Sequence, residues 1–155
     1  MINTLKLRKL VRLMDVILSI KPKYATQILN GTKKYELRRK VFNKDVELAY
    51  IYASHPTKKL VGSFKVGRIL NGTPNKVWSE CKKDAGIEKE EFLSYFYGSN
   101  EAFAIEVRDV RRFRPYINKL PNNLKPPQNF RYLEAGWLWK FLLFVRQAKI
   151  AETSE

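Results

Sequence analysis

Short segments in which apolar and polar residues alternate recur along this chain and constrain its fold more than any other feature. Alternation with a period of two is typical of a strand that buries one face, and a run of branched apolar residues is typical of a fully buried strand. Turn residues, such as the proline in HPTKK, separate these segments. The sequence therefore predicts a hairpin-rich β-sheet with strands at 15–20, 33–39, 46–54, 60–70 and 101–113.

Helical segments are predicted between and after these strands. Residues 21–31 place Pro22 in a first helical turn and end at Asn30-Gly31, a pair that favours a left-handed stop. Two further short helices are predicted at 73–86 and 87–98, then an irregular Pro- and Asn-rich loop at 114–129, and finally a helix from residue 131 to about 148. The order up to residue 113 is β-α-β-β-β-α-α-β, which predicts an α+β fold.

Size and charge define the class of protein and its partners. A chain of 155 residues suits one domain with a single core. Its 30 Lys and Arg against 15 Asp and Glu give a formal charge of +15, which attracts polyanions, so nucleic acid is the leading predicted partner. With one cysteine and one histidine, no disulfide framework or Cys/His zinc site is expected, no metal or cofactor is predicted, and a reducing, cytoplasmic location is favoured.

The stretch GTKKYELRRK sets one glutamate among basic residues. With the helix before it, this stretch resembles the ASCH domain, a PUA-like family marked by a short helix that leads into a G-x-K-x-x-E-x-R motif. The motif positions here are Gly31, Lys33, Glu36 and Arg38. The later segments YIYAS, VGSFKVGRI, EEFLSYFYG, AFAIEV and PPQNFRYL look like the prokaryotic and archaeal branch of that family. The resemblance implies a small PUA-like β-barrel with flanking short helices and a basic cleft between them.

We assign residues 14–133 to this ASCH/PUA-like domain, with two additional segments outside it. Residues 1–13 form a basic N-terminal extension without a secretory signal pattern, and residues 134–155 form an extra C-terminal helix and tail. The apolar run at 137–145 contains Lys140 and is too short to span ~30 Å of hydrocarbon, so no membrane association is expected. Docking of this helix on the core is the simplest interpretation, and a homodimer through it is the second.

The spacing of the motif sets a geometric condition on any cleft that it lines. Glu36 and Arg38 project from the same strand face, whereas Lys33 would point away from a regular strand. Lys33 joins them only if it lies in the turn after Gly31, where glycine permits positive φ. Glu36 would then accept hydrogen bonds from an amine or ring N–H of a base, while Arg38 binds a carbonyl or phosphate. The alternative is a surface ion pair worth ~0–1 kcal/mol with no chemical role.

The predicted ligand-binding set extends beyond the motif to basic, polar and aromatic side chains at strand ends and near the Pro-rich loop. Most aromatic residues are expected in the core, but those that directly follow an irregular loop are favoured at a cleft mouth, where they stack on a single-stranded or flipped base. The full set is Lys21, Lys33, Glu36, Arg38, Arg39, Tyr52, Ser54, Phe130, Arg131 and Tyr132.

Two functions from different classes follow from these features. The first is an RNA-binding domain that recognises a single-stranded or modified nucleotide in the basic cleft, with a role in RNA metabolism or regulation. The second is a hydrolase, because some ASCH-like proteins deacetylate N4-acetylcytidine and others are described as ribonucleases. In that case Lys33 and Glu36 would be the catalytic residues, provided that burial shifts their pKa values toward neutrality. A third hypothesis is a protein-interaction module of a transcription regulator that uses the C-terminal helix.

The sequence departs from the deacetylase pattern at two positions. That subgroup has a threonine where this chain has Glu36, and its later catalytic glutamate aligns near Ala85 or Gly86. Asp84 would have to replace that glutamate. A neighbouring Glu36 would also raise the pKa of Lys33, whereas a nucleophilic or basic lysine needs a lowered one.

Overall fold

The structure is a computed structural model that describes residues 3–4, 13–120, 123–133, 140 and 143. Its elements follow in the order β1 (Met14–Ile20), α2 (Pro22–Leu29), β2 (Tyr35–Arg38), β3 (Val46–Ala53), β4 (Lys59–Gly72), α3 (Pro74–Cys81), α4 (Lys89–Tyr95), β5 (Ala102–Ile117) and β6 (Phe130–Leu133). The predicted order of strands and helices up to β5 is confirmed.

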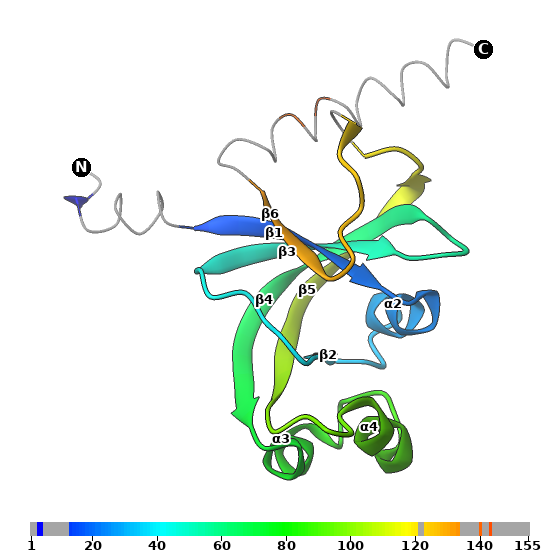
Figure 1. The fold of residues 1–155 in the computed structure, drawn as a ribbon. Coiled ribbons are helices and arrows are strands. Elements are labelled where there is room, and N and C mark those ends of the chain that lie inside the picture. Colours follow the sequence, from blue (N-terminus) through cyan, green and yellow to red (C-terminus); the bar gives the residue numbers. More distant parts are fainter. Residues whose placement is uncertain (1–2, 5–12, 121–122, 134–139, 141–142, 144–155) are drawn as a thin grey trace.

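Within the described residues the strands form one six-stranded sheet in the order β2-β5-β4-β3-β1-β6 (Figure 1). β1 runs parallel to β3, and every other neighbouring pair is antiparallel. In Figure 1, β1, β3 and β6 lie in the upper part, while β4 and β5 bend away from them toward α3 and α4. Helix α2 lies between the upper strands and the α3–α4 pair.

The sheet does not close into the predicted small β-barrel. Its edge strands β2 and β6 have four residues each and lie at opposite ends of the strand order. The long strands β4 and β5 have 14 and 16 residues, and three register shifts along their ladder bend the sheet. The bend brings β2 opposite the C-terminal ends of β1 and β3, but side chains rather than ladder hydrogen bonds occupy the space between these strands.

Local sequence accounts for the three helices. α2 begins at Pro22, and Gly31 continues the turn after its end with φ +80°. α3 begins at Pro74 behind Thr73, whose hydroxyl accepts a hydrogen bond from a backbone N–H of the first turn. α4 carries two glutamates in its first turn, which complement the positive end of the helix dipole. The predicted helices at 21–31, 73–86 and 87–98 are confirmed, with shorter bounds.

The end of the domain differs from the prediction. β5 continues to Ile117 instead of ending at residue 113, and the helix predicted from residue 131 is replaced at its start by β6. β6 pairs antiparallel with β1, which satisfies backbone groups on an edge that would otherwise be open. This tertiary pairing overrides the local helical pattern. The rest of the predicted C-terminal helix and most of the N-terminal extension lie outside the described residues, so the domain bounds and the homodimer stay predictions.

Three clusters of buried side chains stabilise the sheet. The first packs α2 against β1, β3 and β4, with Ile28 and Phe64 among its members. The second packs α3 and α4 against β2 and the N-terminal part of β5, around Phe92. The third covers the other face around Tyr50 and Leu60. We call the boundary between the first and second clusters the seam, and the motif residues lie along it.

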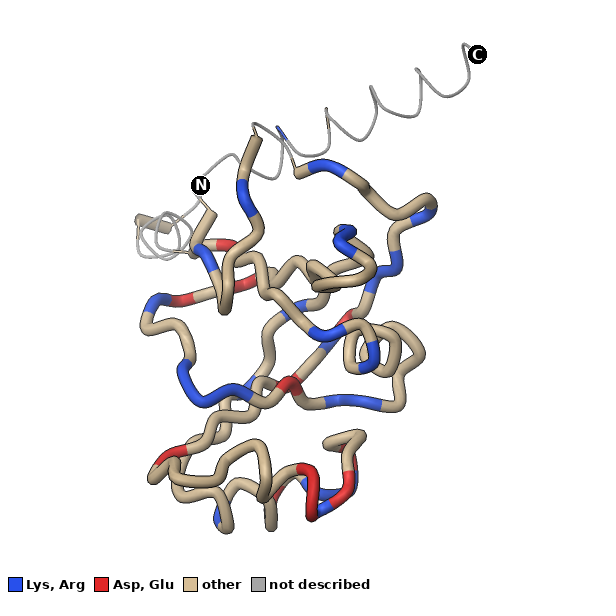
Figure 2. Tube along the Cα trace, turned by 45° about the vertical axis from the view of Figure 1, so that its right-hand side comes forward, with Lys and Arg blue, Asp and Glu red and all other residues tan. Residues whose placement is uncertain are grey.

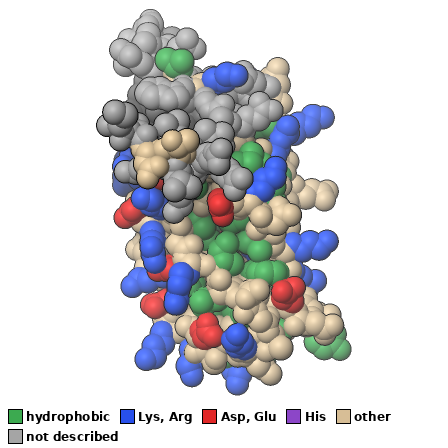
Figure 3. All heavy atoms as spheres, turned by 90° about the vertical axis from the view of Figure 1, so that its left-hand side faces the viewer, with side chains coloured by type: hydrophobic (Ala, Val, Ile, Leu, Met, Phe, Trp, Pro, Cys, Tyr) green, Lys and Arg blue, Asp and Glu red, His purple; other side chains and the backbone are tan. Residues whose placement is uncertain are grey.

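Charged side chains are distributed unevenly over the described chain. Lys and Arg positions are spread along it, whereas several acidic positions gather near α3 and α4 (Figure 2). Figure 3 shows the face on the left of Figure 1, where hydrophobic side chains occupy the middle and Lys and Arg side chains stand along the margins. Among the described residues, no helix is both long and apolar enough to cross a membrane.

Replacing Phe64 with alanine tests how much the sheet depends on the first cluster. The Phe64 side chain is fully buried, and removing a buried aromatic ring costs about 3–5 kcal/mol of unfolding free energy. The matched change Leu93→Ala on α4, where the side chain is 41% exposed, should cost less than about 1 kcal/mol. Urea unfolding measures both, and equal losses would contradict the assignment of the core.

Candidate functional site

A cavity of about 310 Å³ opens at the seam. The end of β1 and the start of α2 form one wall, β2 forms a second, and α4 with the loop before it forms a third. The lining residues are Ser19, Ile20, Lys21, Tyr24, Lys33, Glu36, Leu37, Arg38, Ser54, Ile87, Tyr95 and Gln128. The fold therefore brings Lys33, Glu36 and Arg38 together, as the motif predicted.

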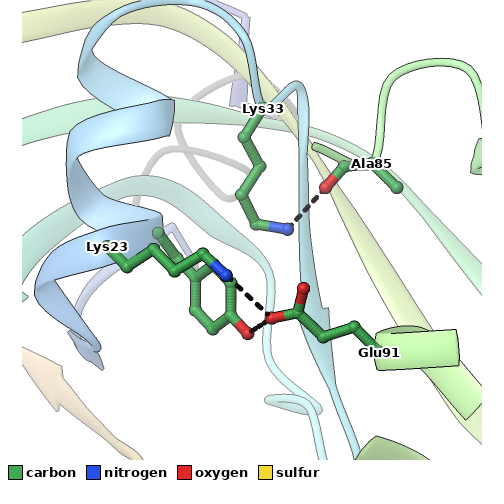
Figure 4. A network of polar contacts seen from close by, with 5 residues as sticks. Lys23, Lys33, Ala85 and Glu91 are labelled. Carbon is green, nitrogen blue, oxygen red and sulfur yellow. Dashed lines mark hydrogen bonds and ion pairs between the residues drawn. The ribbon is translucent and has the colours of Figure 1, made fainter. Parts of the chain in front are cut away.

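Lys33 reaches the cavity from the turn between α2 and β2, as the spacing of the motif required. Gly31 adopts φ +80°, and the Lys33 backbone N–H donates to the Gln27 carbonyl at 3.1 Å. The Lys33 side chain is buried, and Nζ donates to the Ala85 carbonyl at 2.7 Å (Figure 4). Gly86 has φ +70°, and a Cβ there would lie 2.8 Å from Lys33 Cβ, so only glycine lets this loop approach so closely.

The Lys33 ammonium is poorly solvated. Burial lowers the pKa of Lys33 below its ordinary value of 10.5, and Glu36 opposes this shift. Nζ lies 5.2 Å from the centre of the Tyr24 ring, within cation–π range. An ammonium has three N–H donors, and Ala85 accepts from it. Lys33 makes no ion pair with a carboxylate among the described residues, so donors remain for a ligand.

Glu36 supplies a buried carboxylate from β2. The residue is 5% exposed, and its Oε1 lies 3.2 Å from Arg38 Nε in an ion pair whose geometry makes no hydrogen bond. Burial raises the pKa of Glu36, while Arg38 and Lys33 oppose that shift. In the described part of the chain, no group donates a hydrogen bond to this carboxylate. Buried acceptors are normally satisfied, so Glu36 is a candidate to receive donors from a ligand.

Arg38 holds the walls of the cavity together. Its Nη1 donates to Asn129 Oδ1 at 2.7 Å, and its Nη2 donates to the Ser19 carbonyl at 2.8 Å. The guanidinium therefore links β2 to the end of β1 and to the loop before β6, while Nε faces Glu36. These contacts give Arg38 a structural role but use only two of its five N–H donors, and its Nε–H has no hydrogen-bond partner among the described residues. The predicted contact of Arg38 with a ligand carbonyl or phosphate stays a prediction.

Helix α4 is connected across the cavity by two sets of polar contacts. The Tyr24 hydroxyl donates to the Glu91 carboxylate, and Lys23 Nζ lies 3.3 Å from the same oxygen (Figure 4). Burial and the Glu91 contact raise the pKa of Tyr24 to about 12. The Arg39 guanidinium donates to the Tyr95 carbonyl and lies 5.4 Å from the centre of its ring. These contacts hold the Tyr24 and Tyr95 rings at the cavity.

The other predicted ligand residues fall at three places. Lys21 and Ser54 line the cavity, and Arg39 lies beside it on Tyr95. Tyr52 lines a second hollow together with His55 and Lys58. This second hollow shares lining residues with the cavity, namely Ser19, Ser54 and Gln128, so the two form a continuous depression.

The structure does not bring Phe130, Arg131 and Tyr132 into the cavity. Phe130 packs edge-on against Phe42, and the Tyr132 hydroxyl accepts a hydrogen bond from the Asn43 backbone N–H at 2.8 Å. Alternation along β6 turns these two rings toward the first cluster, while Arg131 is exposed. The aromatic residues that line the cavity are Tyr24 and Tyr95.

Several lining residues were missed because they come from elements that meet β2 only in the folded chain. Tyr95 is the last residue of α4, Ile87 precedes this helix, and Gln128 lies in the Pro-rich loop. Their spacing from the motif along the chain gives no signal of contact with it. Tyr24 on α2 lines the cavity as well, and its hydroxyl contacts Glu91 on α4.

The cavity has no counterpart, among the described residues, of the later catalytic glutamate of the deacetylase pattern. At the aligned position the chain offers Lys33 only the Ala85 backbone carbonyl, and Gly86 has no side chain. The Asp84 carboxylate is half exposed and lies 3.9 Å from Lys34 Nζ, so it pairs with the neighbouring lysine. No group of three or more His, Cys, Asp or Glu among the described residues is placed to hold a metal ion.

Comparison with known proteins gives a family match that includes most of the cavity. The family model of the ASCH domain matches residues 18–115. An ASCH domain-containing ribonuclease from Zymomonas mobilis is 28% identical over 140 residues, which cover 87% of this chain and 95% of that protein. The crystal structure of ASCH from Zymomonas mobilis matches with a TM-score of 0.76 and 28% identity, covering 83% of this chain and 93% of that one.

A second relative is much longer than this chain. The large ribosomal subunit protein uL22 of Ureaplasma parvum is 28% identical over 122 residues, which cover 77% of this chain but 39% of that protein. The matched part therefore accounts for well under half of that relative.

Substitution of Gly86 tests whether the loop after α3 must approach Lys33 closely. An alanine at either Gly86 or Gly98 must adopt positive φ, which costs roughly 1–2 kcal/mol. At Gly86 the added Cβ also meets Lys33 at 2.8 Å, whereas at Gly98 it meets nothing within 4 Å. Gly86→Ala should therefore lose about 1–3 kcal/mol more than Gly98→Ala in urea unfolding. Equal losses of unfolding free energy would mean that the loop shifts to accommodate the added Cβ at no measurable cost.

Proposed function

Because the chain belongs to the ASCH domain family, we propose that it binds RNA and that its cavity receives one unpaired nucleotide. The observation that carries this proposal is the buried carboxylate of Glu36, which lines the cavity and receives no hydrogen bond from the described residues. A nucleobase edge carries N–H donors and fits this acceptor. The neighbouring ammonium of Lys33 would meet a base carbonyl or a phosphate oxygen.

Size and lining support a single nucleotide rather than a duplex. A volume of about 310 Å³ is at the lower end of the range for small-ligand sites. The apolar side chains of Ile20, Leu37 and Ile87 and the rings of Tyr24 and Tyr95 offer surfaces against which a flat base packs. A base stacked and paired in a duplex cannot reach groups this deeply buried. The substrate class that fits is therefore single-stranded RNA or an extruded nucleotide.

The surroundings of the cavity suit the sugar-phosphate chain on both sides of that nucleotide. Lys21, Lys23 and Arg39 are exposed near its mouth, where they neutralise phosphates. The second hollow continues from the cavity and carries Lys58 and His55, which would take the flanking nucleotide. The net charge of +15 adds a long-range attraction for polyanions.

A second candidate function is RNA cleavage at the same site, favoured by the opposite pKa shifts of Glu36 and Lys33. Burial raises the pKa of the Glu36 carboxyl and lowers the pKa of the Lys33 ammonium, so both pKa values move toward neutrality. The alignment with the Zymomonas relative, which is named a ribonuclease, covers 95% of that relative. In this candidate a ribose-phosphate unit, rather than a base, lies against the two side chains.

The cleavage step would be an internal transfer at phosphorus. Glu36 accepts the proton of the ribose 2′-hydroxyl as the 2′-oxygen attacks the adjacent phosphorus, and Lys33 donates a proton to the departing 5′-oxygen. The bond from phosphorus to that oxygen breaks, which leaves a 2′,3′-cyclic phosphate and a free 5′-hydroxyl. Removal of the acetyl group from N4-acetylcytidine has less support, because Ala85 offers Lys33 only a backbone carbonyl at the aligned position and the Asp84 carboxylate pairs with Lys34.

Binding is tested by charge-removing substitutions inside and beside the cavity. Lys33→Met should weaken binding of a single-stranded RNA roughly 10- to 100-fold, because a hydrogen bond from a buried charge is lost. Lys34→Met removes the same charge one residue away, where the side chain is exposed, and should weaken binding only slightly. Fluorescence anisotropy at two salt concentrations measures both, with circular dichroism to check folding. Equal affinities for the two variants would argue against the cavity as the RNA site.

Cleavage is tested by its dependence on pH. The rate should rise as Glu36 ionises above its raised pKa and fall as Lys33 loses its proton above its lowered pKa. The active window is then narrower than the interval from 4.5 to 10.5 between the ordinary pKa values of the two groups. Mass spectrometry of products in the presence of EDTA should find 2′,3′-cyclic phosphates for the wild type and none for Glu36→Gln. Cleavage that survives this change would exclude Glu36 as the base.

A further inference from the structure

We propose that the cavity selects guanine, an inference that rests on the proposed binding of an unpaired RNA nucleotide. The argument starts from the hydrogen-bonding character of Glu36. The Arg38 guanidinium lies 3.2 Å from Oε1 of Glu36 and favours the carboxylate form, which only accepts hydrogen bonds. A base that satisfies it must present donors, and two adjacent donors satisfy both of its oxygens.

Among the four bases, only guanine places two donors side by side on its Watson–Crick edge. These donors are the ring N1–H and the exocyclic N2 amine. Adenine and cytosine each place an amine beside a bare ring nitrogen, whose lone pair would face the Glu36 anion. Uracil has a single N–H between two carbonyl oxygens, which would also face the anion. Leaving a buried charge against a lone pair costs more than losing a hydrogen bond, so the discrimination is expected to be large.

Lys33 completes the pattern that guanine requires. The guanine O6 acceptor adjoins N1–H, so a base bound to Glu36 needs a donor next to the carboxylate. The Lys33 ammonium lines the same cavity, is held in place by the Ala85 carbonyl at 2.7 Å, and keeps N–H groups for a ligand. Lys33 and Glu36 are close enough to influence each other's pKa, yet no ion pair joins them among the described contacts. Both groups line the cavity and would meet neighbouring atoms of one base edge.

The walls of the cavity favour a large flat base. The Tyr24 ring on α2 lies within cation–π range of the Lys33 ammonium. The Tyr95 ring on α4 is contacted by Arg39, which follows β2. A purine offers more stacking area to such rings than a pyrimidine does. Stacking alone does not separate guanine from adenine, so that choice is assigned to Glu36 and Lys33.

The experiment compares pentamers of sequence UUXUU in which X is G, A, C, U or inosine. Every nucleotide of the pentamers carries a 2′-fluoro group, which removes the attacking hydroxyls and prevents cleavage during the measurement. Fluorescence anisotropy should give at least about 10-fold tighter binding for G than for A, C or U. Inosine lacks the N2 amine but retains N1–H and O6, so its affinity should fall between those of guanine and adenine.

Glu36→Gln provides the test on the protein side. The amide presents an acceptor and a donor in place of two acceptors, so this variant should lose the preference for G while the exposed lysines still bind every pentamer weakly. Glu47→Gln is the matched control, because Glu47 is exposed on β3 and should keep the preference. The inosine comparison uses the wild type and stays decisive if Glu36→Gln does not fold.

The outcomes separate the two levels of the proposal. Equal affinity of the wild type for all five pentamers would overturn guanine selection and leave RNA binding standing. Absence of binding to every pentamer, with the protein folded, would overturn the proposed RNA binding itself. A preference for G that persists in Glu36→Gln, or an inosine affinity equal to that of guanine, would also overturn the assignment of Glu36 to the guanine edge.

Discussion

The cavity depends on one buried guanidinium. Arg38 donates to the Ser19 carbonyl at the end of β1 and to Asn129 before β6, and its Nε lies beside Glu36. These contacts connect β2, an edge strand four residues long, to the opposite end of a sheet that does not close. A barrel would join these edges by ladder hydrogen bonds. Here a side chain spans the opening, which leaves room for a ligand between the strands.

Burying three charged side chains at the seam is costly, and this cost is itself informative about function. Replacing a buried ionic group by apolar residues of similar volume is often neutral or stabilising, so stability alone does not explain Lys33, Glu36 and Arg38. Their burial moves the pKa values of Lys33 and Glu36 in opposite directions toward neutrality. Arg38 has structural contacts through Nη1 and Nη2, while its Nε–H lacks a hydrogen-bond partner among the described residues. Lys33 and Glu36 also keep hydrogen-bonding capacity that the described chain does not use, which is expected where a ligand completes the site.

Sequence patterns predicted the parts of this site that local physics controls. The alternation over residues 33–39 located β2, and the positive φ of Gly31 placed Lys33 in the turn where it meets the cavity. Long-range pairing could not be predicted in the same way. The β6 strand forms because β1 offers an open edge, which carries Phe130 away from the cavity and onto Phe42. Likewise, the closure that the family resemblance implied depends on the bend of β4 and β5, not on any local pattern.

The loop after α3 controls what chemistry the seam supports. Its Ala85 carbonyl is a neutral acceptor for Lys33, and Gly86 excludes a side chain from the space next to that lysine. A carboxylate here would pair with the ammonium and raise its pKa, whereas a carbonyl leaves burial as the dominant influence and keeps the pKa lowered. A loop of this kind therefore decides whether the lysine is neutralised by the protein or remains available to an electron-rich ligand. In this chain the backbone holds Lys33 in place and leaves its charge for the ligand.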